Sequence, residues 1–318
     1  MKLKSVNTNL DIQIDCFISG VTFLLEYYEV DESPLYLNDI SYFKSSDIDV
    51  ETVHNYEFNE IMDKLGFEYN KVYIEKDNFI RTLQFQIDGG YPIIVDIDMY
   101  YNPISPGTYH RTHARHALYV YGYENDMFNV IEINWINSSQ YKEHKIPFEE
   151  LEKCYFSYKD NFKEAYVHLF YKKSEDNCLQ FDYRDEYKTF VKKNIDFIHE
   201  GILQLKSNIA IFVNECSDHD KILQKSSYLH NNFSNIIRHH TVEMSLLNKY
   251  FSDANMITDK LSQSIVLWMG IRAGFYKMMC QKKYNEKLVN SSIEKLLTVQ
   301  KYEEEAYNEL LHWLSIKI

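Results

Sequence analysis

Proline occurs only in the first part of this chain of 318 residues, and that limits the folds open to the rest. The five prolines are Pro34, Pro92, Pro103, Pro106 and Pro147. Proline inside a helix removes a hydrogen bond and clashes with the preceding turn, so a long proline-free region suits a helical bundle. We therefore expect the two parts of the chain to differ in architecture.

The proline-free part has apolar residues three and four positions apart, which is the spacing of amphipathic helices. It predicts about five helical stretches after residue 182, among them residues 187–198, 261–279 and 293–314. The run Arg238-His239-His240 is interpreted as helix surface. The polar segment K-K-S-E-D-N at 172–177 is expected to link the two parts, which gives a first domain at 1–173 and a helical domain at 174–318.

The first part begins with helical patterns and continues with strand patterns. Helices are predicted at residues 16–28, 55–66 and 77–87, and strands at residues 92–98, 116–123, 128–134 and 164–171. The segment Y-E-N-D-M between the second and third strands is typical of a hairpin turn. Helices followed by an antiparallel sheet predict an α+β fold for this part.

Composition excludes several classes of function. A net charge of -13 would repel a nucleic-acid backbone, and no basic patch is visible to overcome that repulsion. No apolar run approaches the roughly 18 residues that span a bilayer, so we expect a cytoplasmic protein without a membrane contact. The five cysteines contain no C-x-x-C pair, which argues against a zinc knuckle or a disulfide framework.

Cys16 is the cysteine whose surroundings favour reactivity. It opens an apolar helical run, I-D-C-F-I-S-G-V-T-F-L-L-E-Y-Y, and a helix N-terminus stabilises a thiolate. The alternative is a small buried residue without chemistry. Asp15 would oppose a thiolate, so we expect its side chain to point away from the sulfur or to pair with Arg111 or Arg115.

A thiolate nucleophile needs a base, and that base is usually oriented by a third group. His116 begins a predicted strand, and pairing through the turn near Asn125 brings residue 134 opposite it. Asn134 is therefore the predicted orienting residue. Glu132 is the competing one, because it lies two positions nearer the turn on the same strand face.

Other polar residues near these strands have less specific patterns. His110, His113 and His116 are spaced by three, which does not fit the usual zinc sites, and no metal is predicted. The loop of residues 101–115 is expected to lie over the site, where Arg111 and Arg115 could meet an acidic substrate or a carrier phosphate; a solvated loop is the alternative. Asp96 and Asp98 share a strand face and could bind an amine or serve only structure.

The order of these motifs resembles papain-like cysteine enzymes. It is similar to the double-glycine bacteriocin-processing peptidases and, more specifically, to the butirosin biosynthesis protein H N-terminal domain family. The matching segments are D-C at 15–16, G-Y-P-I-I-V-D-I-D-M-Y-Y-N-P at 90–103, R-H-A-L-Y-V-Y-G-Y at 115–123, I-N at 133–134 and I-P-F-E-E-L at 146–151. The proline-free part is similar to the helical domain that often accompanies this family.

The resemblance implies a papain-like catalytic domain that transfers an acyl group through a cysteine thioester. Cys16 would be the nucleophile, His116 the base and Asn134 the orienting residue of a Cys-His-Asn triad. The peptidases carry a glutamine for the oxyanion hole six residues before the cysteine, where this chain has Leu10. Gln13 and Asn9 are the nearby substitutes, with Asp98, Arg111 and Arg115 as further substrate-binding candidates.

The function expected from the resemblance is an acyltransferase of specialised metabolism. The donor would be a thioester on an acyl carrier protein or a peptidyl carrier domain, and the acceptor a small-molecule amine. No cofactor is expected beyond the phosphopantetheine that the carrier partner brings, and a homodimer is possible. The alternatives are a papain-like peptidase or amidase with the same residues, and a non-catalytic binding or scaffold protein.

Overall fold

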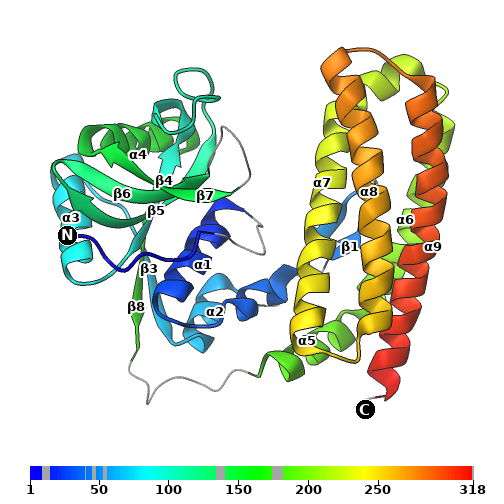
Figure 1. The fold of residues 1–318 in the computed structure, drawn as a ribbon, viewed down its shortest axis with the longest axis horizontal. Helices are drawn as coiled ribbons and strands as arrows, with labels where there is room; N and C mark the ends of the chain where they lie inside the picture. The colour runs from blue at the N-terminus through cyan, green and yellow to red at the C-terminus, as the bar shows by residue number, and fades with distance from the viewer. Residues whose placement is uncertain are drawn as a thin grey trace. The chain divides into compact units, whose positions relative to one another are not determined.

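The computed structural model describes residues 1–8, 15–39, 41–44, 48–52, 56–133, 140–173 and 182–316 (Figure 1). The chain divides into two compact units. The first consists of Met1–Leu35 and Tyr56–Phe181, and the second of Tyr36–Asn55 and Asp182–Ile318.

The first unit is built on an antiparallel sheet with the strand order β3-β8-β4-β5-β6-β7. The strands are β3 (Phe67–Val72), β4 (Ile93–Asp98), β5 (Arg115–Glu124), β6 (Met127–Ile133), β7 (Tyr141–Pro147) and β8 (Val167–Lys172). The four predicted strands correspond to β4, β5, β6 and β8, so the α+β arrangement with an antiparallel sheet is confirmed. β3 and β7 were not predicted, because they are the edge strands and mix polar residues with apolar ones instead of forming an apolar run.

The hairpin between β5 and β6 sets the register at the candidate site. Its turn residues Asn125 and Asp126 have φ values of 46° and 61°, as a tight two-residue hairpin turn requires. The pairing shifts by one residue between Val120 and Gly122. On the side of this shift that lies away from the turn, Tyr119 pairs with Ile131. Since a one-residue shift moves every side chain to the other face, this bulge decides which β6 side chains share a face with His116.

The two faces of the sheet are covered by different helices (Figure 1). On one face lies α1 (Cys16–Tyr27), whose Gly20 packs so closely on β4 that an added Cβ would lie 3.1 Å from the Ile94 Cδ1 atom. On the other face, α3 (Phe79–Asp88) and α4 (Phe148–Phe162) share a core with alternate residues of β4 and β5. α2 (Phe58–Lys64) packs beside β3.

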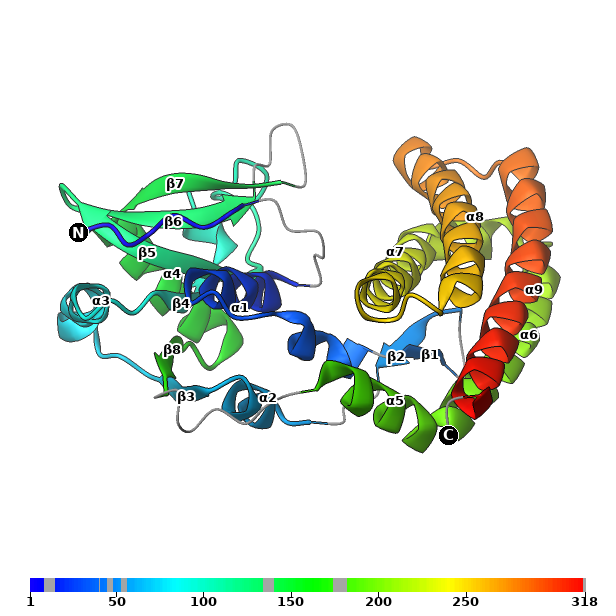
Figure 2. The same ribbon diagram turned by 60° about the horizontal axis from the view of Figure 1, so that its bottom comes forward.

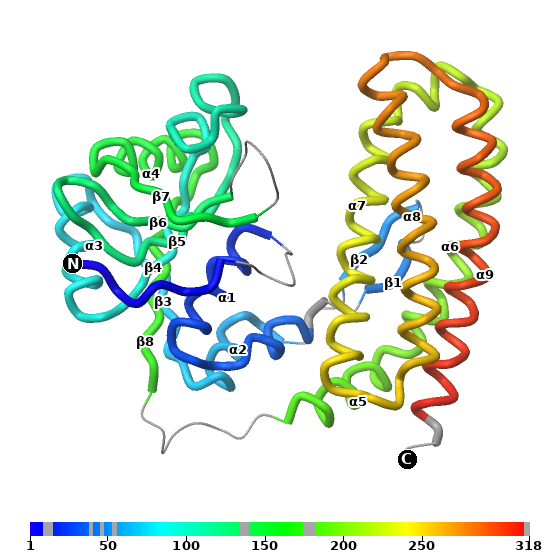
Figure 3. The backbone as a smooth tube through the Cα atoms, in the orientation of Figure 1, coloured from blue at the N-terminus to red at the C-terminus, as the bar shows by residue number. Residues whose placement is uncertain are grey.

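The second unit is mainly helical, so the predicted C-terminal helical region is confirmed (Figure 2). Its helices are α5 (Tyr183–Lys193), α6 (Ile195–Glu215), α7 (His219–Tyr250), α8 (Asn255–Gln281) and α9 (Glu286–Ile316). The predicted helix at residues 187–198 is interrupted at Asn194, which ends α5 and precedes α6. α6 to α9 run up and down beside one another (Figure 3). Buried side chains such as Phe233 and Trp268 lie in the core of this unit.

A short hairpin from the N-terminal part of the sequence belongs to the second unit. β1 (Ser41–Phe43) pairs with β2 (Val50–Thr52) and packs against α6. The contact depends on Gly201 of α6, where a Cβ would lie 2.8 Å from the Phe43 backbone nitrogen. The predicted division at 173/174 did not include this crossover, since the apolar residues Phe43 and Val50 of so short a hairpin do not reveal on which unit they pack.

In the part of the chain that the structure describes, no helix is both long and apolar enough to cross a bilayer.

Candidate active site

Cys16 is the first residue of α1, and the residue before it holds that helix end in place. Asp15 is the N-cap, and its Oδ1 accepts a hydrogen bond of 2.8 Å from the Ile18 amide. N-capping satisfies an amide that otherwise lacks an acceptor. N-capping therefore explains why an acidic residue precedes the cysteine. The Asp15 carboxylate is turned toward the helix amides, and in the described residues it forms no ion pair with an arginine.

His116 lies near the start of β5 and contacts Glu132 of β6. Its Nε2 lies 3.0 Å from Glu132 Oε1 and 2.8 Å from Oε2. Because Tyr119 pairs with Ile131, alternation along the strands puts Glu132 on the sheet face that His116 also occupies. Glu132, the competing residue of the sequence prediction, is thus the group that orients His116 in the described structure.

The charge of the His116 ring follows from this contact. The side chains of His116 and Glu132 are 9% and 0% exposed. Burial acts to lower the pKa of His116, but the negative charge of Glu132, the interaction with Cys16 and the hydrogen bonds to Glu132 outweigh it and raise the pKa to about 10. The ring is therefore an imidazolium at neutral pH. Since Nε2 faces Glu132, Nδ1 is the nitrogen left for Cys16.

Glu132 is held by two further donors. The Asn102 side-chain amide donates to Oε2 at 3.1 Å, and the Ile133 backbone amide donates to Oε1 at 2.7 Å. A buried carboxylate needs such donors as well as its counter-charge. Asn102 follows β4 and was not singled out from the sequence, because its role depends on a contact thirty positions away along the chain.

Three of the predicted site residues lie outside the described residues. They are Asn134, the predicted orienting residue, and Gln13 and Asn9, the predicted oxyanion-hole substitutes.

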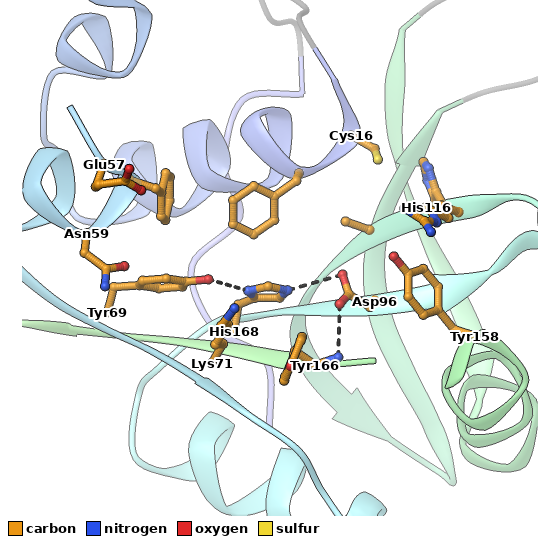
Figure 4. Close-up of a pocket in the computed structure, with 14 residues that line it drawn as sticks. Cys16, Glu57, Asn59, Tyr69, Lys71, Asp96, His116, Tyr158, Tyr166 and His168 are labelled. Atoms are coloured by element: carbon orange, nitrogen blue, oxygen red, sulfur yellow. Dashed lines mark hydrogen bonds and ion pairs between the residues drawn. The ribbon is translucent and has the colours of Figure 1, made fainter. Parts of the chain in front are cut away.

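Cys16 and His116 line one cavity of about 500 Å³ (Figure 4). Its walls are largely aromatic, and the rings come from Phe17, Phe58, Tyr69, Tyr158 and Tyr166. Charged side chains of both signs also line it, namely Glu57, Lys71, Asp96 and Arg115. Pockets with apolar walls and a few polar groups are typical of small-molecule sites.

The wall opposite His116 carries a chain of hydrogen bonds (Figure 4). Burial and the Asp96 charge raise the pKa of Tyr69 to about 12, so its hydroxyl keeps its proton and lies 2.8 Å from His168 Nδ1. His168 Nε2 lies 3.2 Å from Asp96 Oδ1, and the Tyr166 amide donates to Asp96 Oδ2 at 3.0 Å. Phe17, next to Cys16, packs on the His168 ring. Asp96 therefore faces the cavity.

Asp98, the predicted substrate-binding carboxylate, has a different position. It is fully buried, and its Oδ2 lies 2.6 Å from His113 Nδ1 and accepts from Ser157 at 2.7 Å. Burial acts against ionisation, but these hydrogen bonds hold the pKa of Asp98 below its ordinary value. Asp98 ties the loop after β4 to α4, while its neighbour Asp96 lines the cavity of Cys16.

The contacts of Asp98 with His113 and Ser157 also hold the loop of residues 101–115 against α4. Tyr101, Tyr109 and His110 line a separate cavity of about 600 Å³ beside α4. Of the two predicted arginines, Arg115 lines the cavity of Cys16, whereas Arg111 is an exposed turn residue. The expected loop over the site is thus packed against α4, and Arg115 is its one residue that lines the cavity of Cys16.

A scan against models of known protein families found no matching family, and a search of curated proteins found no match to this chain.

Proposed function

We propose that the first unit is a cysteine-dependent acyltransferase of papain-like type. The observation that carries the proposal is that His116, held by Glu132 through Nε2, and Cys16, at the start of α1, line the wall of one cavity. A nucleophile, a base and a group that orients the base are the parts that acyl transfer through cysteine requires. The triad is Cys16, His116 and Glu132.

The first step forms an acyl-enzyme. The imidazolium of His116 and the N-terminus of α1 both favour the thiolate of Cys16. The sulfur attacks the carbonyl carbon of a thioester donor, the bond from that carbon to the donor sulfur breaks, and His116 gives its proton to the departing thiolate. The amide of Cys16 itself, in the first turn of α1, is a donor for the oxyanion.

The second step transfers the acyl group. A neutral amine attacks the carbonyl of the acyl-Cys16 thioester, His116 now accepts a proton from the amine nitrogen, and the Cys16 sulfur leaves as a thiolate. Atoms and charge balance, because the proton given in the first step is regained in the second. Asn102 and Glu132 keep Nδ1 directed at the sulfur through both steps.

The substrates proposed are a thioester on a carrier protein and a small-molecule amine. A cavity of about 500 Å³ has room for a small acyl group and its acceptor. Arg115, a cation in its wall, suits the phosphate of a phosphopantetheine arm, and Asp96 suits an amine that arrives as an ammonium ion and releases its extra proton to solvent before it attacks. The aromatic side chains of the walls suit the apolar parts of both substrates.

Mass spectrometry of the intact protein tests the acyl-enzyme directly. The full chain is incubated with an acyl-pantetheine thioester, and we expect a mass increase of one acyl group that maps to Cys16 and disappears when an amine is added. Cys16→Ala should show no increase. Cys280→Ser is the matched control, because Cys280 is an exposed cysteine of the second unit.

The alternative functions predict different results for acylation, peptide hydrolysis and alkylation. Hydrolysis of peptides without a thioester donor would make the site a peptidase or amidase. A Cys16 that neither acylates nor reacts with iodoacetamide faster than Cys280 would leave a binding protein. Full turnover by Cys16→Ala would refute the proposal.

A further inference from the structure

The helical unit contains a small cavity with a charged wall. It measures about 50 Å³ and lies between β1 and the helices α6, α7, α8 and α9. Apolar side chains such as Ile202, Leu261 and Leu310 form much of its lining, and three titratable side chains, His240, Glu243 and Glu303, face it as well. Charged groups beside so small an apolar cavity need an explanation, because burying them costs free energy.

Glu303 of α9 is the most enclosed member of this group, with 3% of its surface exposed. Its contacts all fall on one oxygen. Oε1 accepts from the Ser264 hydroxyl and from Trp268 Nε1 at 3.1 Å, and it lies 3.0 Å from His240 Nε2. No described residue donates a hydrogen bond to Oε2.

Glu243 of α7 repeats this arrangement. The Tyr187 hydroxyl donates to its Oε1 at 3.3 Å, and within the described ranges its Oε2 has no hydrogen-bond donor. Burial, to which the charge of Glu303 adds, raises the pKa of Glu243 although His240 acts in the opposite direction. That is the behaviour of a carboxylate without a full counter-charge.

His240 was expected on a helix surface, and that expectation is wrong. The residue is 5% exposed, because the face of α7 that carries it turns toward α9 and Glu303. Burial acts to lower the pKa of His240, but the negative charge of Glu303 outweighs it and raises the pKa. Neither ring nitrogen has a hydrogen-bond partner among the described residues, although Nε2 lies 3.0 Å from Glu303 Oε1 and the side chain lines the cavity.

The charges and hydrogen bonds of this cluster do not balance. Two carboxyl groups face one imidazole ring, and no lysine or arginine of the described chain lines the cavity. Two carboxyl oxygens have no donor among the described residues, and the two buried ring nitrogens of His240 have no hydrogen-bond partner there. Water could fill the space but would bring no charge, and no group of His, Cys, Asp and Glu in the described ranges has the arrangement that holds a metal ion.

We propose that this cavity binds the ammonium head of a small primary amine, with Oε2 of Glu243 and Oε2 of Glu303 as its acceptors. A primary ammonium group supplies both the missing positive charge and several N–H donors. The first carbons of the amine lie against Ile202, Leu261 and Leu310. This site belongs to the second unit and is independent of the acyl transfer proposed for the first.

The size of the cavity determines which ammonium ions can bind. A volume of about 50 Å³ is less than twice the ~30 Å³ that one water occupies in the liquid. An ammonium head with its first methylene group fits such a space, whereas a quaternary head with four methyl groups does not. Binding should therefore decrease from ethylammonium through trimethylammonium to tetramethylammonium, while total charge stays the same.

Isothermal titration calorimetry of the full chain with this series tests the site without any variant. We expect saturable binding of one ethylammonium per chain, at least tenfold weaker binding of trimethylammonium, and none of tetramethylammonium or of neutral ethanol. Equal heats from all three cations would indicate general charge screening and would overturn the proposal. So would the absence of saturable ethylammonium binding, or binding of a divalent metal ion in its place.

Two variants locate the binding. Glu243→Gln keeps the shape and the contact with Tyr187 but removes one acceptor charge, and it should weaken ethylammonium binding at least tenfold. Glu294→Gln changes an exposed glutamate of α9 and should leave the affinity unchanged. Circular dichroism checks that each variant is folded. If folded Glu243→Gln binds ethylammonium as the original chain does, the amine binds elsewhere and the assignment is refuted.

Discussion

Glu132 contacts Nε2 of His116 with both carboxylate oxygens, at 3.0 Å and 2.8 Å, and its side chain is fully buried. The pair joins neighbouring strands β5 and β6 at the end of the sheet where α1 begins with Cys16. An asparagine in the same position could orient the ring, but only a carboxylate also stabilises its charge. The charge of Glu132 therefore links the fold of the sheet to the chemistry proposed for the cysteine.

The first prediction concerns the proton on His116. Glu132→Gln keeps the size of the side chain and removes its charge, so the ring should lose its proton at a lower pH. We expect the NMR titration midpoint of His116 to fall from about 10 toward the ordinary value of ~6.5. Glu149→Gln, an exposed change in the same unit, is the control. An unchanged midpoint would show that Glu132 does not set the charge.

The second prediction is the pH dependence of stability. The pKa of His116 is raised in the folded chain, so the stability that it contributes is fully present below ~6.5, its unfolded value. That contribution is lost as the pH rises toward about 10. The original chain should exceed Glu132→Gln in free energy of unfolding by on the order of 2 kcal/mol at pH 6, and the difference should shrink toward pH 10. Urea denaturation at several pH values measures it; a difference that grows with pH would contradict the argument.

The third prediction separates the two properties of Asp15. Asp15→Ala removes the N-cap of α1 and should destabilise the first unit by about 1 kcal/mol. Asp15→Asn keeps a capping oxygen and removes the negative charge beside Cys16, so stability should be nearly unchanged while alkylation of Cys16 by iodoacetamide becomes faster. Thermal unfolding and alkylation rates are measured on both variants. Equal stability of the two would mean that the cap contributes little.

The fourth prediction concerns Asp98. In Asp98→Asn a neutral amide replaces a buried carboxylate that accepts hydrogen bonds from His113 and Ser157, and we expect a loss of about 2 kcal/mol of stability. Acylation of Cys16 should change little, because Asp98 anchors the loop to α4 and does not line the cavity. Asp96→Asn is the matched comparison, since Asp96 lines the cavity and should affect turnover more than stability. The reverse pattern would assign the substrate contact to Asp98.

The sequence alone determined the architecture of each part of the chain. Proline and helical spacing predicted the C-terminal helices, because both act within a few residues. Alternating apolar residues and the Asn125-Asp126 turn predicted the central strands and the hairpin for the same reason. Cys16 at a helix start and His116 near a strand start were also found, since each depends only on its local context.

The tertiary structure decided which residues meet. The bulge between Val120 and Gly122 shifts the register by one residue and so places Glu132 on the face of His116. It forms where the N-terminal segment pairs with β5, with the Leu3 amide donating to the Tyr121 carbonyl at 3.0 Å. That contact joins residues more than a hundred positions apart, and no local pattern reveals it. The cluster of His240, Glu243 and Glu303 was missed for the same physical reason, because its charges are explained only by neighbours on other helices.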